Sequence, residues 1–499
     1  MNIKSFILIL IILALTPPSF AQDFTYTYEG QTLTYSVIDN NEKLCTIING
    51  ENVNGVLTIP SEVKYGENIF SVVSIAELAF YGSNLTSVIL PNSISSIGAN
   101  SFRMCENLVS VTIPESITKI EDSTFLGCSN LSSLKLPDSL ESIGEDAFLG
   151  CSSLISITIP SSVTSIGYNA FKECDNLISI YFNAESCSEC GNMENQVFPT
   201  TIQEVYVGNQ VKLIPNYIFF KCSNLKKMEI GSSVTSIGDY AFYECINLTS
   251  LIIPPSVTTI GESAFYFCDS LTSIDIPDSV TSIGSWAFAN CTDVVTLKIP
   301  NSISKIEDYT FSGLWNLISV TLPCNIISIG EFAFSGCGFE SLTLPPSVTS
   351  IAQMSFSGCN KLTSLILPKT ISYIGDGAFY NCNNLASIYY DAIDPVMCNS
   401  DVFKCRDVNS GKEWSLYEKS TLYVPTEALG NYLKTDPWKK FTKIKSFDFA
   451  GMENISENNE LTTAIYTTHG MKINISTDHL SPGIYVLRQG NLVRKIAIK

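Results

Sequence analysis

Seventeen cysteines give this 499-residue chain its largest set of chemically reactive side chains, and most of them are regularly spaced. Equivalent side chains of stacked repeats point the same way at about 4.8 Å, whereas a disulfide needs facing Cβ atoms about 3.8 Å apart. We therefore predict a buried column of free thiols that pack as small apolar side chains. Eleven cysteines belong to this set, mostly 22 or 23 residues apart: Cys105, Cys128, Cys151, Cys174, Cys222, Cys245, Cys268, Cys291, Cys337, Cys359 and Cys382.

The other cysteines offer a single C-x-x-C pair, Cys187 and Cys190. A zinc site would need more cysteines or histidines, and the only two histidines, His469 and His479, lie near the carboxyl end. A redox motif would require a βαβ setting and a thiol of low pKa. A local disulfide and two free thiols both remain open, and we expect no metal and no cofactor. The remaining four cysteines are Cys45, Cys324, Cys398 and Cys405.

The sequence offers no constellation suited to catalysis. Two histidines outside the repeats leave no Ser-His-Asp or Cys-His arrangement within them. Acidic pairs occur before a phenylalanine turn, where carboxylates favour the start of a helical turn, and glycosidase chemistry needs two carboxylates facing one cleft. We predict a protein that is not an enzyme; a surface-targeted hydrolase is disfavoured because no residues remain for a catalytic domain. The acidic pairs are Glu121-Asp122, Glu145-Asp146 and Glu307-Asp308.

Composition restricts the class of partner. Apolar residues make up 45% of the chain and charged residues 15%, so the chain is neither disordered nor highly charged. The formal net charge of −19 disfavours nucleic acid and anionic lipid as the main partner.

The first 21 residues have the layout of a secretory signal peptide. Lys4 precedes an apolar run from Phe6 to Leu15, and the small-residue site ends at Ala21. The run is too short to span a membrane, and no later stretch reaches about 18 consecutive apolar residues. We expect export to the outer-membrane surface or the extracellular space, with no transmembrane segment in the mature chain.

A repeat of 22 or 23 residues organises most of the chain, and a period of this length predicts a solenoid. In one unit, Leu134 and Leu136 alternate with polar residues, which predicts a short strand that ends before Pro137. Gly144 is expected to permit a turn, and a short helical or 3₁₀ turn would then present Phe148 to the core. The repeated phenylalanines are Phe80, Phe102, Phe125, Phe148, Phe171, Phe219, Phe242, Phe265, Phe288, Phe311, Phe334, Phe356 and Phe379.

The unit pattern L-x-x-I-x-I-P-x-x-V-T-x-I-G-x-x-A-F-x-x-C resembles the leucine-rich repeat of BspA-like surface proteins of Gram-negative anaerobes, over roughly residues 55 to 445. The resemblance implies an α/β solenoid, a right-handed superhelix of 22–23-residue units with a parallel β-sheet face and β-rich caps. It also implies a place on the cell surface and adhesion to host proteins or other cells.

The ends of the chain depart from the repeat. Residues 461–499 resemble the sorting domain of the type IX secretion system, a small β-sandwich, through Gly470, Gly483-Ile484-Tyr485 and the closing Lys495–Lys499. That resemblance implies the secretion machinery as a partner, and a plain β-module without a sorting role is the alternative. The predicted segments are a signal peptide (1–21), an N-terminal β cap (22–54), the repeats (55–390, with an insertion at 182–199), a closing repeat and cap (391–447), a linker (448–460) and the β-module (461–499).

Binding residues are sought on the outward side of the predicted strands. One outward column is almost entirely serine, whereas the next column varies from unit to unit. A long surface of small hydroxyls with scattered anchors suits a protein partner on a host or bacterial surface, with Tyr181 and Tyr389 as the best anchors. Two alternatives stay open: tolerated exposed residues, and a structural envelope or matrix protein without a specific ligand. The candidates are Ile89, Lys135, Tyr181, Ile252, Asp275, Lys298, Ile366 and Tyr389.

Overall fold

The computed structural model describes residues 22–407, residues 410–449 and four strands between residues 463 and 498. The signal-peptide prediction and most of the predicted linker fall outside the described residues. The chain divides between Pro199 and Thr200 into two compact units, each of which is described by itself.

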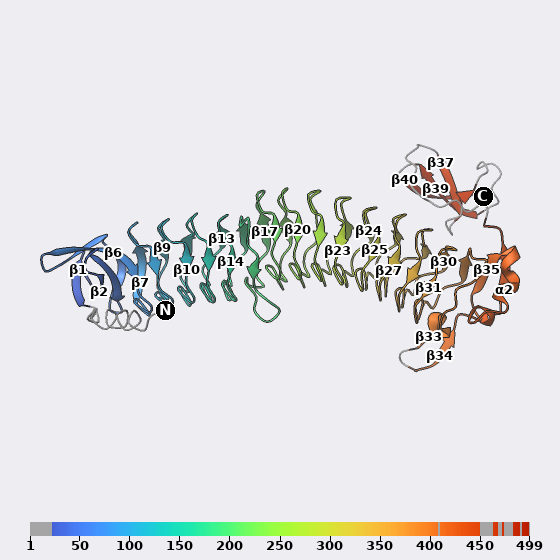
Figure 1. Ribbon diagram of the computed structural model, residues 1–499, viewed down its shortest axis with the longest axis horizontal. Helices are drawn as coiled ribbons and strands as arrows, with labels where there is room; N and C mark the ends of the chain where they lie inside the picture. Colours follow the sequence, from blue (N-terminus) through green and yellow to red (C-terminus); the bar gives the residue numbers. More distant parts are fainter. Residues whose placement is uncertain are drawn as a thin grey trace, which may run out of the picture. The chain divides into compact units, whose positions relative to one another are not determined.

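The first unit begins with a mostly antiparallel sheet in the order β1-β2-β3-β6-β5 (Figure 1). Phe24 of β1 packs against Tyr65 of β5, with ring centroids 4.5 Å apart, so an aromatic cluster closes this end. β3 and β6 pair in parallel. Strand pairing in this sheet therefore changes here from antiparallel to parallel, which is the pairing of the repeats. The strands are β1 (Asp23–Tyr28), β2 (Gln31–Asp39), β3 (Leu44–Asn49), β5 (Glu62–Tyr65) and β6 (Asn68–Ile75).

Most repeats contribute one strand to a parallel array that we name the long-strand face. Equivalent residues of successive repeats are direct partners, for example Ser110 with Ser133, so the register is fixed by the repeat itself. In the first unit the strands are β4 (Asn54–Thr58), β7 (Asn84–Ile89), β9 (Ser110–Thr112), β11 (Ser133–Lys135), β13 (Ser156–Ile159) and β15 (Ser179–Phe182). In the second they are β17 (Glu204–Val207), β19 (Lys227–Glu229), β22 (Ser273–Asp275), β24 (Thr296–Lys298), β26 (Ser319–Thr321), β28 (Ser341–Thr343), β30 (Ser364–Leu367), β32 (Ser387–Tyr390), β35 (Thr421–Pro425) and β36 (Ile444–Phe447).

A second parallel sheet, the short-strand face, comes from the T-S-I-G part of each repeat and was not predicted. Its strands hold only two residues each, usually a polar one followed by a buried isoleucine or equivalent. In the first unit they are β8 (Ser96–Ile97), β10 (Lys119–Ile120), β12 (Ser142–Ile143), β14 (Ser165–Ile166) and β16 (Glu189–Cys190). In the second they are β18 (Leu213–Ile214), β20 (Ser236–Ile237), β21 (Thr259–Ile260), β23 (Ser282–Ile283), β25 (Lys305–Ile306), β27 (Ser328–Ile329), β29 (Ser350–Ile351) and β31 (Tyr373–Ile374).

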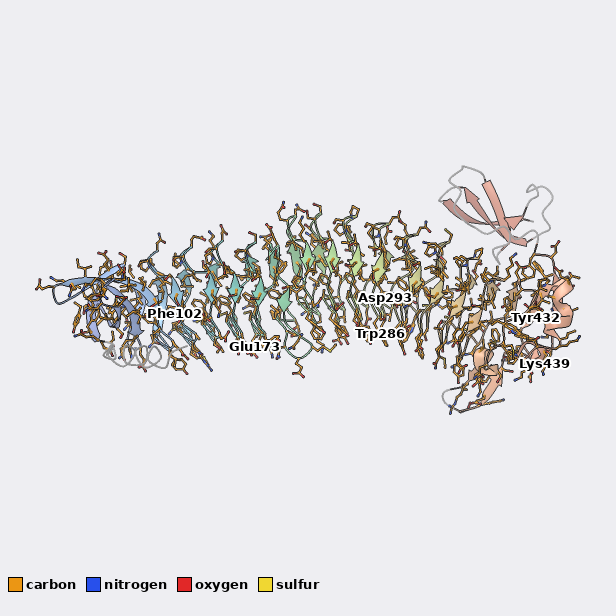
Figure 2. All side chains as sticks on the ribbon, viewed as in Figure 1. Phe102, Glu173, Trp286, Asp293, Tyr432 and Lys439 are labelled. Atoms are coloured by element: carbon orange, nitrogen blue, oxygen red, sulfur yellow. The ribbon has the colours of Figure 1, made fainter. Side chains whose placement is uncertain are left out.

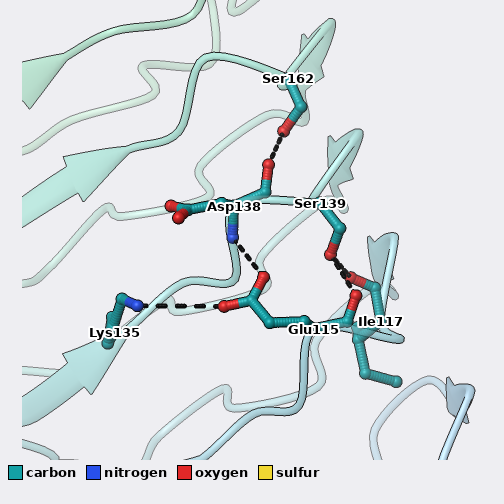
Figure 3. A network of polar contacts seen from close by, with 6 residues as sticks. All are labelled: Glu115, Ile117, Lys135, Asp138, Ser139 and Ser162. Carbon is teal, nitrogen blue, oxygen red and sulfur yellow. Dashed lines mark hydrogen bonds and ion pairs between the residues drawn. The ribbon is translucent and has the colours of Figure 1, made fainter.

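Serines join neighbouring repeats at the corner between the two faces (Figure 3). The Ser139 hydroxyl donates to the Ile117 carbonyl of the preceding repeat at 3.1 Å, and the Ser162 hydroxyl donates to the Leu140 carbonyl at 2.6 Å. Each hydroxyl satisfies a carbonyl that lies outside both sheets. The serine of the P-x-S motif therefore has a structural role that repeats with the period.

Stacked phenylalanines form the centre of the core. Phe265 is fully buried, and its ring lies 5.3 Å from those of Phe242 and Phe288, within 6° of parallel. In the first unit Phe198 of the irregular insertion stacks on Phe171 at 5.3 Å and thereby continues the column. The 48-residue gap in the phenylalanine series is thus partly filled by an aromatic residue that the repeat pattern did not identify.

The segment around each core phenylalanine differs from the prediction, because it is a series of hydrogen-bonded turns and not a helical turn. The Phe265 and Phe267 amides donate to Ala287 and Ala289 of the next repeat, whereas the Tyr266 amide donates back to Ser263. Every second N–H group therefore donates to a carbonyl of the next repeat. The turns of neighbouring repeats are thus joined by backbone hydrogen bonds, as the strands are. A helix would have kept all of these donors within one repeat.

Gly144 also has a different role from the one expected. Its φ is not positive; instead, an added Cβ would lie 2.6 Å from the Asp122 nitrogen of the preceding repeat. Glycine is required here because the two backbones approach closely. The left-handed conformation is found two residues later, at Asp146 (φ 53°).

The second unit ends in a compact cap around Trp438, which is fully buried and donates its indole N–H to the Val396 carbonyl at 2.7 Å. Tyr432 packs edge-on to Trp438 with centroids 5.9 Å apart. The cap elements are η1 (Ser400–Phe403), β33 (Lys404–Arg406), β34 (Glu413–Ser415), η2 (Thr426–Ala428), α2 (Leu429–Tyr432) and η3 (Trp438–Lys440).

Four antiparallel strands follow the cap, in the order β38-β37-β39-β40. They form one sheet, so among the described residues the predicted sandwich is not confirmed. Gly470 and Lys499 of the proposed sorting motif lie outside the described residues. The strands are β37 (Thr463–Thr467), β38 (Lys472–Ile473), β39 (Gly483–Gln489) and β40 (Leu492–Ile498).

Candidate binding surfaces

The variable column of the long-strand face is exposed over most of its length. In the first unit Ile89 and Tyr181 are 45% and 44% exposed, and Lys135 is also exposed. Glu115 accepts a hydrogen bond from the Asp138 amide and lies 3.9 Å from the Lys135 Nζ (Figure 3). The lysine is therefore held only weakly and is accessible to a partner.

Among the side chains described in the second unit, Ile252 is the most exposed large apolar one, at 80%. Residues 249–253 form no strand in the structure, although the repeat predicts one there. Asp275 and Lys298 are direct partners on β22 and β24, and their charged groups lie 3.4 Å apart in solvent. Ile366 is half-buried.

Tyr389 is a correction to the predicted anchors, because only 8% of the residue is exposed. Its ring stacks on Tyr423 at 4.6 Å, and Phe447 packs against it edge-on at 5.2 Å. The closing strands β35 and β36 cover this position. Their register could not be predicted, because the sequence no longer follows the repeat after residue 391. Tyr389 is therefore part of the cap packing.

Tyr206 belongs to the variable column but was missed, because its repeat is degenerate. Tyr206 is the register partner of Glu229, and the Lys227 Nζ lies 2.7 Å from Glu229, 3.2 Å from the Tyr206 hydroxyl and 4.8 Å from the centre of its ring. The hydrogen bond to Glu229, and then that to Tyr206, raise the pKa of Lys227. The alternation E-V-Y-V at 204–207 was the sequence signal that could have located this residue.

The burial predicted for the cysteine column is confirmed, since all eleven side chains lie in the core. Each thiol for which a partner is known donates to a main-chain carbonyl; Cys268, for example, donates to Phe242 at 3.4 Å. Burial raises the pKa of the Cys222 thiol to about 12. A protonated, inaccessible thiol is a poor nucleophile, so the column is structural.

Cys187 and Cys190 differ from the column. Both are buried, and their sulfur atoms lie 3.2 Å apart. Cys190 belongs to β16, the edge strand that pairs with β14, and Cys187 lies in the preceding loop. The two sulfurs are positioned to react with each other.

Two of the three acidic pairs, Glu121-Asp122 and Glu307-Asp308, cap the backbone of the next repeat. The Asp122 carboxylate accepts from the Glu145 amide at 2.9 Å, and Asp308 accepts from the Glu331 amide at 2.7 Å. These bonds explain why the aspartates precede the turn. The sequence had suggested instead that they stabilise the start of a helical turn. In the described part of the chain, no group of three or more acidic, histidine or cysteine side chains could hold a metal ion.

A groove of about 510 Å³ lies in the second unit along β18, β20, β21 and β23 of the short-strand face. Hydroxyl-bearing residues Ser236, Thr259 and Ser282 line it, together with the carboxylates of Asp239, Glu262 and Glu307. Sequence reasoning missed this surface because the short strands themselves were not predicted.

Comparisons with known proteins agree with this architecture. Residues 73–199, 192–318 and 287–406 match the family described as BspA type leucine rich repeat region. The chain belongs to the BspA-type leucine-rich repeat family. Among solved structures, a leucine-rich repeat protein from Bacteroides ovatus is 31% identical with a TM-score of 0.60, over 73% of this chain and 95% of that one.

Two further solved structures are more distant. A leucine rich cell surface protein from Faecalibacterium prausnitzii is 25% identical over 74% of this chain and 95% of its own, with a TM-score of 0.33. The pneumococcal vaccine antigen PcpA is 16% identical over 85% of this chain and 99% of its own, with a TM-score of 0.40. A search of curated proteins gave no match. Within the described residues, no helix of this BspA-type protein has the length and apolar character needed to cross a bilayer.

Proposed function

We propose that this BspA-type protein is exported, displayed on the cell surface and binds proteins of host or bacterial surfaces, as an adhesin does. The observation that carries the proposal is the variable column of the long-strand face. Ile89, Tyr181 and Ile252 are large, apolar and well exposed on a scaffold whose other positions repeat. Exposed apolar anchors on a regular array suit recognition of a protein partner.

Export rests on the signal-peptide layout of residues 1–21 and on the membership of a family whose relatives include a cell surface protein. The resemblance of residues 461–499 to a sorting domain supports delivery by the type IX secretion machinery. Deletion of residues 461–499 is expected to keep the protein off the cell surface, measured by surface proteolysis of whole cells. Unchanged surface display would leave only the signal peptide as the basis for export.

Binding is tested with the mature chain on a panel of purified extracellular-matrix proteins and on whole cells. Replacing Ile89, Tyr181 and Ile252 together by serine should weaken binding at least about tenfold, because exposed anchors contribute most of an interface's energy. Ile318→Ser is the matched control, since Ile318 is 67% exposed but lies outside the column. Unchanged binding by the triple variant would remove the variable column from the interface, and no binding by the wild type would favour a structural envelope role.

A further inference from the structure

The groove on the short-strand face contains no basic side chain. Its 15 lining residues include three acidic ones, Asp239, Glu262 and Glu307, and neither lysine nor arginine. The surrounding repeats show the same imbalance, because residues 231–336 hold ten aspartates and glutamates against two lysines. An occupant of this groove must therefore compensate negative charge.

Two of these carboxylates are held in fixed positions. Asp239 accepts from the Glu262 amide at 2.7 Å, and Glu262 accepts from the Tyr240 hydroxyl at 2.9 Å. Each of these bonds occupies one acceptor site, and a carboxylate has about four. Lys305 pairs with Glu307 at 2.6 Å, so Asp239 and Glu262 are the acids that remain to meet a cationic ligand.

A row of aromatic residues on the turn edge adjoins the groove. The row, named here the aromatic turn row, lies at equivalent positions of five repeats and is interrupted by Ser263 between Tyr240 and Trp286, which is labelled in Figure 2. Burial, followed by Glu262, raises the pKa of Tyr240 to about 12, so its hydroxyl stays neutral. The row consists of Tyr217, Tyr240, Trp286, Tyr309 and Phe332.

The aromatic turn row occupies backbone positions that disfavour large side chains. Trp286 and Tyr309 have φ angles of 61° and 58°. The first unit has no aromatic residue at the equivalent positions, which are Leu78, Asn100, Ser123, Asp146 and Asn169, and asparagine and aspartate tolerate this left-handed region far better than aromatic residues do. The second unit thus keeps aromatic rings where the backbone favours small polar residues.

We propose that the groove and the aromatic turn row together bind an extended segment rich in arginine and lysine from a protein partner. The inference rests on the proposed protein-binding function and names a partner chemistry for it. Guanidinium groups pair with fixed carboxylates and pack against aromatic side chains, which matches Asp239, Glu262 and the adjoining rings. Backbone amides of an extended segment find acceptors in the hydroxyls of Ser236, Thr259 and Ser282.

A glycan is the competing occupant, and the ring geometry disfavours it. Trp286 and Tyr309 stack face to face at 3.7 Å with planes 6° apart, and Phe332 stacks on the other side of Tyr309 at 4.7 Å. Both faces of Tyr309 are therefore covered by neighbouring rings, so this ring offers no face to a sugar, whereas the carboxylates remain open to cations.

The test measures binding of a synthetic peptide with alternating arginine and serine to the mature chain, by fluorescence anisotropy at low and high salt. Removing the charges with Asp239→Asn and Glu262→Gln together should weaken binding at least about tenfold, since paired charges carry the contact. Trp286→Asn should weaken it several-fold while the melting temperature moves by no more than about 4 °C, because lost stacking and relieved strain oppose each other.

The matched control is the pair Asp122→Asn and Glu145→Gln in the first unit. Asp122 and Glu145 are 23 residues apart, as Asp239 and Glu262 are, and the Asp122 carboxylate likewise accepts from the Glu145 amide. The control pair differs in having no aromatic residue after the aspartate, because Ser123 follows Asp122 where Tyr240 follows Asp239. We expect this control to change affinity by less than about twofold.

Three outcomes would overturn the inference. The first is equal weakening by both charge pairs, which would indicate unspecific attraction. The second is no binding of the peptide by the wild type, and the third is binding of cellohexaose with loss in Trp286→Asn, which would indicate a glycan site. None of these outcomes touches the proposed function, which is judged by the separate binding of whole proteins to the long-strand face.

Discussion

Cysteine has two roles in this protein, and the distance between sulfur atoms separates them. Thiols of the column, such as Cys268, are bonded to main-chain carbonyls and have no access to solvent. Cys187 and Cys190 instead lie 3.2 Å apart at an edge strand. The repeat therefore uses sulfur as a packing group, whereas the insertion at 182–199 brings two sulfurs within reach of each other.

We expect Cys187 and Cys190 to form a disulfide when the folded protein meets an external disulfide such as oxidised glutathione. The two thiols lose two hydrogen atoms to the oxidant, which leaves as two thiols. Intact-mass measurement should show the loss of two hydrogens, and peptide mapping should place it at 187–190, with Cys245 and Cys268 still reduced as the internal control. A pair that stays reduced, or cross-links within the column, would contradict this expectation.

At the scale of the element, the close approach of successive repeats decides which residues are tolerated. Gly261 faces the preceding repeat, and a Cβ there would lie 2.6 Å from the Asp239 nitrogen and 2.7 Å from the Gly238 carbonyl carbon. Both neighbours are backbone atoms that belong to the stack. Even a methyl group is therefore excluded at Gly261, because it would lie too close to the backbone of the preceding repeat. The φ angle of Gly261 is not positive and does not itself require glycine.

Gly261→Ala is expected to lower the free energy of unfolding by about 1–3 kcal/mol, because the two repeats must move apart. The urea midpoint measures this loss. Gly430→Ala is the matched control: no atom lies within 4 Å of its added Cβ, and the residue is in α2. The control should be neutral or stabilising by up to about 1 kcal/mol, and an equal loss in both variants would contradict the steric explanation.

Sequence periodicity predicted the core well, because the residues that stack must recur with the period. Phe265, Leu271 and Cys268 are buried as their positions in the repeat require. The short-strand face was missed because two residues per strand give no alternation to detect. Tyr389 was misplaced since its burial depends on Tyr423, which joins the sheet after the 30 residues 391–420 that do not follow the repeat. The groove lies on the short-strand face and so could not be derived from a column of the long strands.

At the scale of the whole molecule, each compact unit is a series of nearest-neighbour contacts. Phe265 contacts the rings of Phe242 and Phe288, one repeat away on either side. In such an array, stability is approximately a sum over repeats and their interfaces. Damage to one repeat should therefore remain local.

Phe265→Ala is expected to cost about 3–5 kcal/mol through the cavity that it leaves. Hydrogen exchange should accelerate in the repeats from about residue 242 to 291 and stay unchanged around Trp438 in the cap. Tyr266→Ala, a half-buried neighbour on the turn edge, should produce a much smaller effect. Faster exchange throughout the second unit would show that the repeats unfold as one body.

The in-register pairing of the repeats also has an evolutionary consequence. Thr259 pairs with Ser236 on one side and Ser282 on the other, in the same residue-to-residue alignment. Loss of the 23 residues 255–277 would join Pro254 to Asp278 and recreate the P-x-S-V sequence at the junction. Recombination between neighbouring repeats can therefore shorten or extend the gene by whole periods while the in-register pairing of the strands is kept. The length of the binding surface is thus open to selection in steps of one repeat.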